Sequence, residues 1–140
     1  MHDEGRGRRI LIVEDEAIIA QLLADLLEIL GYAMIGPAAG VRQALELIAA
    51  QPIDAAVLDI NLAGEMSYPI ADVLLARGVP FVFSTGYDRE RLPEAYRRFP
   101  YLQKPFHWQE LGKTLAAMLP LQAGLGDTLA TGGARAAASG

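Results

Sequence analysis

The stretch Arg9-Ile10-Leu11-Ile12-Val13-Glu14-Asp15-Glu16 carries the pattern that decides the fold. Its first five residues are nearly all apolar and rich in β-branched side chains, which is typical of a parallel strand covered on both faces. The apolar run ends in three acidic residues, and a helical pattern starts directly after them. We therefore interpret residues 9–13 as a buried first strand with carboxylates at its carboxyl end.

The alternation of strand and helix continues along the chain. Apolar residues recur at helical spacing after the first strand, and Gly31 supplies a C-terminal stop. This stripe consists of Ile18, Ile19, Leu22, Leu23, Leu26, Leu27 and Leu30. The further elements expected are helices at about 41–50, 68–77 and 107–119, and strands at 33–36, 54–58, 80–84 and 101–103. Phe106 and Trp108 are interpreted as core, because aromatic residues at helical spacing usually pack.

One segment breaks the regular pattern. Pro93 and Pro100 interrupt the chain between the fourth and fifth strands, so any fourth helix there should be short or irregular. Five strand and helix units with short connections predict an α/β fold, a doubly wound parallel sheet with helices on both faces.

The chain is expected to form one domain at residues 9–120. Residues 1–8 are interpreted as a short basic lead-in. Residues 121–140 are rich in Ala and Gly, a composition that cannot offset ordering entropy, so they are expected to be a flexible tail.

The composition limits the possible functions. The 140 residues are 52% hydrophobic and 21% charged, which suits a globular domain with a core. With no Cys and two His, a thiolate site is impossible and a zinc site is not expected. A formal net charge of −5 argues against direct nucleic-acid binding. No apolar run is long enough to cross a bilayer and no secretory signal is recognised, so we expect a cytoplasmic location without membrane contact.

Polar side chains follow four of the expected strands. Glu14 and Asp15 follow the first strand, Asp59 the third, Thr85 the fourth and Lys104 the fifth. In an open parallel sheet, ligands bind beyond the carboxyl ends of the strands, where the strand order reverses. We therefore expect these five side chains to meet at one edge of the sheet.

Each of these side chains suits phosphoryl transfer. Clustered carboxylates repel one another and need a cation, and Mg²⁺ prefers hard oxygen ligands together with a phosphate. Asp59 is the expected nucleophile, because a carboxylate can form an acyl phosphate. Thr85 offers a hydroxyl donor and Lys104 a positive charge to phosphoryl oxygens. The metal and the lysine would neutralise the charge that develops during transfer.

Ordinary alternatives exist for every one of these residues. Asp15 could be only a helix N-cap, and Asp59 an ordinary loop carboxylate. Thr85 could be a turn residue, and Lys104 a solvated surface lysine. Their joint placement at the strand ends favours a site.

The same residues carry a family resemblance. Residues 10–16, Val57-Leu58-Asp59-Ile60-Asn61-Leu62 and Lys104-Pro105-Phe106 resemble the acidic, phosphoacceptor and lysine motifs of response-regulator receivers, with Thr85 at the family's hydroxyl position. The match covers about 9–119. Within the family, Phe83-Ser84-Thr85-Gly86-Tyr87, with 64–69 upstream, resembles the subgroup called FATGUY receivers, found mainly in alphaproteobacteria.

The resemblance implies further properties. It implies the flavodoxin-like strand order 2-1-3-4-5, a histidine kinase or histidine phosphotransferase as phosphodonor, and Mg²⁺ as cofactor. It implies that the backbone carbonyl of Asn61 joins Asp15, Asp59 and Glu14 around the metal. It also implies a cis Lys104-Pro105 bond and a switch in which Tyr101 rotates inward as Thr85 moves toward the phosphoryl group. Some members of the subgroup act in general stress signalling.

Two departures from the family pattern matter. Many receivers have two aspartates where this chain has Glu14-Asp15, so Asp15 is expected to bind the metal directly and Glu14 through water. Many have a Met-Pro pair where this chain has Leu62-Ala63. Tyr101 could also be merely an edge-strand aromatic.

Three functions compete at this point. The first is a phosphorylation-controlled switch that is not itself an enzyme, whose output passes through a downstream protein or along a relay, since no effector module is recognised after Leu119. The second is an aspartate-nucleophile phosphatase acting on small molecules, but the loop after Asp59 offers no clear general acid. The third is a pseudo-receiver that is never phosphorylated, and the presence of all four site motifs argues against it.

Overall fold

The fold of the chain is seen in a computed structural model that describes residues 7–119. The strands of the main sheet are β1 (Arg9–Val13), β2 (Ala33–Ala38), β3 (Ala55–Asp59), β6 (Phe81–Thr85) and β7 (Tyr101–Gln103). The helices are α1 (Ala17–Leu30), α2 (Val41–Ala50), α3 (Tyr68–Ala76) and α4 (Trp108–Met118). The proposed flexible tail, 121–140, and most of the lead-in, 1–8, lie outside the described residues.

The main sheet has the predicted topology. Its five strands run in the order β2-β1-β3-β6-β7, and all four pairings between neighbours are parallel. This is the expected order 2-1-3-4-5, because β6 and β7 are the fourth and fifth strands of this sheet. The order reverses at β1 and β3, so their carboxyl ends form the crevice where ligands bind in such folds.

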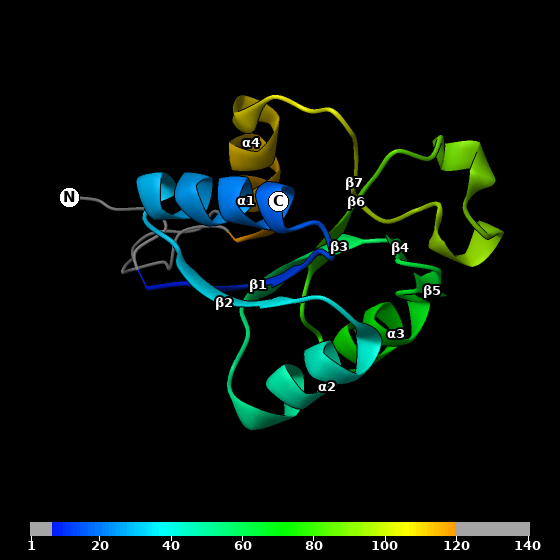
Figure 1. Ribbon diagram of the computed structural model, residues 1–140, viewed down its shortest axis with the longest axis horizontal. Coiled ribbons are helices and arrows are strands. Elements are labelled where there is room, and N and C mark those ends of the chain that lie inside the picture. The colour runs from blue at the N-terminus through cyan, green and yellow to red at the C-terminus, as the bar shows by residue number, and fades with distance from the viewer. Residues whose placement is uncertain (1–6, 120–140) are drawn as a thin grey trace, which may run out of the picture.

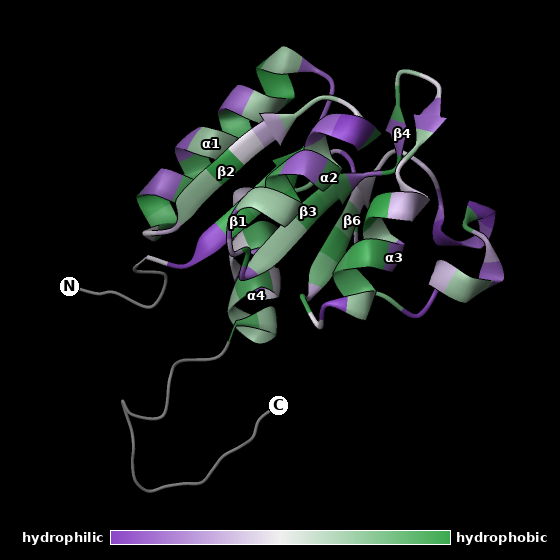
Figure 2. Ribbon diagram, turned by 90° about the horizontal axis from the view of Figure 1, so that it is seen from below, coloured by the Kyte–Doolittle hydropathy of each residue, from purple (hydrophilic) through white to green (hydrophobic). Residues whose placement is uncertain are grey.

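Helices cover both faces of the sheet (Figure 1). One core lies between the sheet and α2 and α3, and it takes Leu11, Val13, Leu58 and Phe83 from the strands. The other lies beneath α1 and α4, and it takes Ile10, Ile12, Val57 and Val82. The central strands are hydrophobic along most of their length (Figure 2). Burial on both faces explains why their sequences are apolar runs without alternation.

The end of α1 follows the sequence prediction closely. Gly31 caps the helix with φ 90°, in the left-handed region that glycine adopts without strain. Its backbone N–H donates to the carbonyl of Glu28 at 3.1 Å. The chain then turns directly into β2.

A small hairpin after Asp59 was not predicted. Strands β4 (Asn61–Leu62) and β5 (Glu65–Met66) are antiparallel and leave a two-residue turn at Ala63 and Gly64. Both turn residues have positive φ, 54° and 98°, as a type I′ hairpin turn requires. The turn places the Asn61 side chain beside the carboxyl edge of the sheet.

The segment 87–100 is irregular, as predicted. It contains two short 3-10 helices, η1 (Arg89–Arg91) and η2 (Glu94–Tyr96), which lie beyond the edge of the sheet (Figure 1). Leu92, between them, is 1% exposed and anchors the segment in the core beneath α2 and α3.

Aromatic packing also ties this segment to the helix layer. The Tyr96 ring stacks on Tyr68 with a centroid distance of 4.5 Å. The Tyr96 hydroxyl donates to Asp72 Oδ1 of α3 at 2.7 Å. Burial, with this hydrogen bond, raises the pKa of Tyr96 to about 12.

The prediction that Trp108 is a core residue was wrong. Trp108 is 50% exposed at the start of α4, and Phe106 is only partly buried. Ile18 and Leu22 of the predicted α1 stripe are also exposed, at 86% and 56%. Ile18, Leu22 and Trp108 pack in neither core, so helical spacing at these positions does not imply burial.

An apolar groove of about 590 Å³ lies between these exposed residues. Its walls are Ile19, Leu22, Leu23 and Leu26 of α1 and the run Lys104–Trp108. Within residues 7–119, no helix combines the length and the apolar character that crossing a membrane requires.

Candidate functional site

Three carboxylates meet at the carboxyl edge of the sheet. Glu14 and Asp15 follow β1, and Asp59 is the last residue of β3. Ligand oxygens from the three side chains lie within 4.8 Å of one another. Because β1 and β3 pair in parallel register, the sheet itself brings these side chains together.

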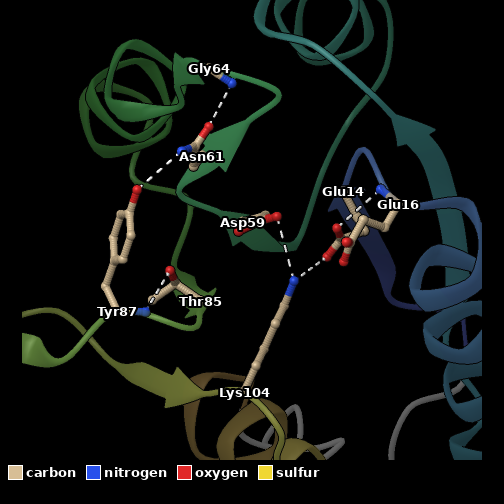
Figure 3. A network of polar contacts seen from close by, with 8 residues as sticks. All are labelled: Glu14, Glu16, Asp59, Asn61, Gly64, Thr85, Tyr87 and Lys104. Atoms are coloured by element: carbon tan, nitrogen blue, oxygen red, sulfur yellow. Dashed lines mark hydrogen bonds and ion pairs between the residues drawn. The ribbon is translucent and has the colours of Figure 1, made fainter.

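Lys104 reaches the same point from the end of β7 (Figure 3). Its ammonium nitrogen Nζ lies 2.8 Å from Glu14 Oε1 and 3.4 Å from Asp59 Oδ2. The Lys104 backbone N–H donates to the Thr85 carbonyl at 2.7 Å, so the backbone of β6 positions the lysine. Lys104 is therefore not a solvated surface residue.

The contacts within the cluster shift the pKa values of Asp59 and Lys104. Burial, and then the charge of Glu14, raise the pKa of Asp59 from 3.8 to about 7, although the charge of Lys104 opposes this. Burial alone would lower the pKa of Lys104, but the hydrogen bond with Glu14 and the charge of Asp59 raise it overall. A cation that bound beside Asp59 would favour its ionised form.

Glu14 and Asp15 occupy different environments. Glu14 is 3% exposed, and both its oxygens have partners, since Oε1 contacts Lys104 and Oε2 accepts the Glu16 N–H at 3.2 Å. Asp15 is only partly buried, and it lines a cleft of about 650 Å³ together with Asp59. The cap position of α1 is Glu16, and no side-chain cap is seen among the described residues at this end of the helix. The N-cap alternative for Asp15 is therefore not supported.

Thr85 and Asn61 lie on the other side of Asp59 (Figure 3). Thr85 is 2% exposed, and its hydroxyl oxygen accepts the Tyr87 N–H at 3.2 Å. Asn61 donates from Nδ2 to the Tyr87 hydroxyl at 3.0 Å and accepts the Gly64 N–H at 2.6 Å. A chain of hydrogen bonds thus joins the hairpin to the end of β6.

Tyr101, the predicted switch residue, lies on β7 opposite Phe83, while Thr85 lies opposite Gln103. The hydroxyl of Tyr101 is buried and has no hydrogen-bond partner within the described part of the chain. The guanidinium of Arg89 lies over its ring, 4.7 Å from the centroid. Burial raises the pKa of Tyr101.

The cleft contains two residues that sequence reasoning gave no role. Tyr87 and Arg91 line it together with Asp15, Asp59, Asn61, Thr85 and Lys104. The Arg91 guanidinium lies 4.8 Å from the centroid of the Tyr87 ring. Tyr87 was visible only as part of the motif at 83–87, and nothing in the sequence marked Arg91.

The predicted cis bond between Lys104 and Pro105 is confirmed. A second cis bond, between Gly36 and Pro37, was not predicted. After Pro105 the chain enters α4 through a capping box, in which the His107 backbone N–H donates to Glu110 at 2.8 Å.

Comparisons with known proteins agree with this geometry. The family model described as "Response regulator receiver domain" matches residues 10–116. The transcriptional regulatory protein PdtaR of Mycobacterium tuberculosis is 32% identical over 113 residues, which are 78% of this chain and 55% of PdtaR. The chain spans about half the length of the curated relatives it matches.

Solved structures extend the comparison. SdrG from Sphingomonas melonis is 46% identical with a TM-score of 0.72, over 81% of this chain and 97% of SdrG. The receiver domain of PhyR from Erythrobacter litoralis is 33% identical with a TM-score of 0.73, over 81% and 91% of the two chains. TrrA from Thermotoga maritima, solved in complex with Mg²⁺-BeF, is 26% identical with a TM-score of 0.72, over 80% and 99%.

The likeness to SdrG and PhyR agrees with the FATGUY pattern of residues 83–87. The fold, the cluster of carboxylates with Lys104 and the matching family model lead to one conclusion. This chain belongs to the response regulator receiver domain family.

Proposed function

We propose that this chain is a phosphoacceptor switch that takes a phosphoryl group on Asp59 from the phosphohistidine of a histidine kinase or phosphotransferase. One observation carries the proposal. The carboxylates of Glu14, Asp15 and Asp59 lie within 4.8 Å of one another, and the Lys104 ammonium lies 2.8 Å and 3.4 Å from two of them. A general role as a phosphorylated, Mg²⁺-binding domain follows from the family, and the assignment to these residues is ours.

The donor set at the acidic cluster fits Mg²⁺. All its members are oxygen ligands, and Asp59 holds a raised pKa that a nearby cation would lower. We assign direct binding to Asp15 and Asp59 and to the backbone carbonyl of Asn61. Glu14 acts through water, since both its oxygens already have protein partners. When bound, Mg²⁺ neutralises charge on the phosphoryl oxygens.

The protein's own groups carry out the transfer. An ionised Asp59 oxygen attacks phosphorus, and the nitrogen–phosphorus bond of the donor breaks with its electron pair left on the imidazole. Lys104 stabilises the negative charge of the transferring group, and the Thr85 hydroxyl donates to a phosphoryl oxygen. The chain itself is the acceptor, so it turns over no separate substrate.

Thr85 and Tyr101 form the proposed switch. A donation from Thr85 to the phosphoryl group competes with its present role as acceptor of the Tyr87 N–H. The buried hydroxyl of Tyr101 has no partner among residues 7–119, so its present position costs free energy that a rotation of the ring can recover. The surface around β7 then changes shape and alters the binding of a downstream protein, or phosphate passes along a relay.

The apolar groove between α1 and the run Lys104–Trp108 supports a protein donor. Lys104 lines both this groove and the cleft at Asp59, so a protein seated in the groove lies next to the acceptor. Leu22 and Trp108 in the walls of the groove are exposed, and such side chains suit the apolar face of a donor helix. Because donors of this kind act in the cytoplasm, we propose a cytoplasmic location for this chain.

The donor is tested by comparing two sources of phosphate. Leu22→Glu, in the groove, should slow transfer from a phosphorylated histidine phosphotransferase at least about tenfold and leave labelling by acetyl phosphate unchanged. Ile29→Glu is the matched control, because Ile29 is 75% exposed on the same helix and does not line the groove. If the two variants accept phosphate at the same rate, the groove does not bind the donor. If wild-type protein accepts none, the donor is not a phosphohistidine.

A further inference from the structure

Arg91 differs from the other arginines of segment 87–100. Arg89, Arg97 and Arg98 each donate to backbone carbonyls of the segment. Within residues 7–119, the Arg91 guanidinium makes no hydrogen bond or ion pair, and its one specific contact is the stacking on Tyr87. Three of the arginines therefore stabilise the backbone of the segment, whereas the Arg91 guanidinium can bind a ligand.

The position of Arg91 is nevertheless well defined. Its backbone N–H donates to the Asp88 carbonyl at 2.9 Å, and the next residue, Leu92, is 1% exposed in the core. Tyr87, whose ring lies beneath the guanidinium, is fixed at two points: its hydroxyl accepts from the Asn61 amide at 3.0 Å, and its backbone N–H donates to the Thr85 hydroxyl at 3.2 Å. A fixed platform of this kind reduces the entropy lost when the guanidinium binds a ligand.

The charges that line the cleft indicate a role for Arg91 in binding an anion. Asp15 and Asp59 line the cleft, and a phosphodonor is itself an anion. The Lys104 ammonium is already shared by Glu14 and Asp59, at 2.8 Å and 3.4 Å. Arg91 lines the same cleft and is exposed, so it is the cation that an approaching phosphodonor can meet first.

We propose that Arg91 is a second cation for the phosphoryl group, which binds the oxygens of the incoming phosphodonor at the mouth of the cleft and directs it onto Asp59. This inference rests on the proposed function. The planar guanidinium presents two N–H groups in parallel to phosphate oxygens, and its charge attracts anions from solution. Arg91 therefore acts mainly on the capture of the donor.

Phosphoryl transfer from acetyl phosphate, which tests the role of Arg91, requires no proton transfer. An Asp59 carboxylate oxygen attacks the phosphorus of acetyl phosphate, and the bond from phosphorus to the acetate oxygen breaks. Acetate leaves with the electron pair and carries away one negative charge, while the new acyl phosphate on Asp59 keeps the charge of the phosphoryl group. Arg91 neither gives nor takes a proton in this step.

The test compares Arg91→Gln with Arg98→Gln, measuring the second-order rate of labelling by acetyl phosphate with saturating Mg²⁺. Both variants lose one positive charge from an exposed arginine of the same segment, but Arg98 does not line the cleft. Arg91→Gln should label roughly threefold to tenfold more slowly, and Arg98→Gln at the wild-type rate. The deficit of Arg91→Gln should shrink as salt is added, because an exposed charge is screened. Matching melting temperatures of the two variants show that the fold is intact.

Each outcome decides the question. Wild-type rates for Arg91→Gln, or equal slowing of both variants, overturn the role of Arg91 and leave the phosphoacceptor role in place. If wild-type protein takes no label, the proposed function fails, and the role of Arg91 fails with it.

Discussion

The acidic cluster of Glu14, Asp15 and Asp59 and the segment 87–100 face the same cleft but are built in different ways. The cluster lies at the ends of β1 and β3, whose positions the parallel sheet sets through backbone hydrogen bonds. The segment has no regular helix beyond η1 and η2, and arginine side chains bonded to carbonyls hold much of it together.

This difference in construction matches a difference in function between the cluster and the segment. Attack on phosphorus needs groups fixed by the scaffold, and the sheet supplies them. Capture of a donor and response to phosphorylation need groups at the rim, and the segment supplies these from Tyr87 to Arg91. Substitutions in each region test whether the two are as distinct as their contacts indicate.

The largest effect on stability should come from the anchor of the segment. Leu92→Ala removes a fully buried side chain and should lower the free energy of unfolding by about 2–4 kcal/mol, measured by urea titration. Leu75→Ala makes the same change at a position that is 48% exposed and should cost less than about 1 kcal/mol. Similar costs for the two variants would mean that the segment is not anchored in the core.

The next effect concerns the metal. Asp15→Asn should weaken Mg²⁺ binding roughly tenfold to a hundredfold, since Asp15 lines the cleft and belongs to the carboxylate cluster with Glu14 and Asp59. Glu16→Gln is the control, because Glu16 also lines the cleft but is not part of that cluster, and its backbone N–H, which the substitution retains, still donates to Glu14. Isothermal titration would contradict the assignment if both variants bound Mg²⁺ equally.

Uncoupling of the switch should be seen in Thr85→Ala. The variant should still accept phosphate on Asp59, but the amide signals of residues 101–103 should shift on phosphorylation much less than in wild-type protein, because the ring of Tyr101 no longer responds. Ser84→Ala is the control, since it removes a neighbouring buried hydroxyl that has no hydrogen-bond partner among residues 7–119, whereas the Thr85 hydroxyl accepts the Tyr87 N–H. If the amide signals of Thr85→Ala shift on phosphorylation as much as those of wild-type protein, Thr85 does not couple Asp59 to Tyr101.

The smallest effect is on stability against pH in metal-free buffer. The pKa of Asp59 is raised from 3.8 to about 7, so the folded state binds the proton more tightly than the unfolded state does. The stability this gives is present at acid pH and is lost as the pH rises through about 7. Asp59→Asn, which stays neutral, should therefore gain at least about 1 kcal/mol over wild type between pH 5 and pH 8. A constant difference between the two proteins would show that Asp59 titrates normally.

Residues on the regular part of the fold could be predicted from the sequence. Buried parallel strands are apolar runs that end abruptly, so Glu14, Asp59 and Thr85 could be placed at one edge without coordinates. Their meeting at one point follows from strand order alone.

Other features depend on contacts that the sequence does not display. The hairpin at 61–66 has Ala63 rather than Asn or Asp at its first turn position, which conceals the usual signal before Gly64. Trp108 has helical spacing but packs in neither core and is exposed. Arg91 lines the cleft next to Leu92, which packs in the core, and local sequence does not reveal such a distant contact.

The central claim is that Asp59 accepts a phosphoryl group at a Mg²⁺-dependent site. Intact-mass measurement after incubation with acetyl phosphate and Mg²⁺ tests it directly, on wild-type protein and on Asp59→Asn. We expect a gain of one phosphate in wild-type protein, and no gain in Asp59→Asn or in wild-type protein treated with a chelator. A gain of phosphate by Asp59→Asn equal to that of wild-type protein would contradict it.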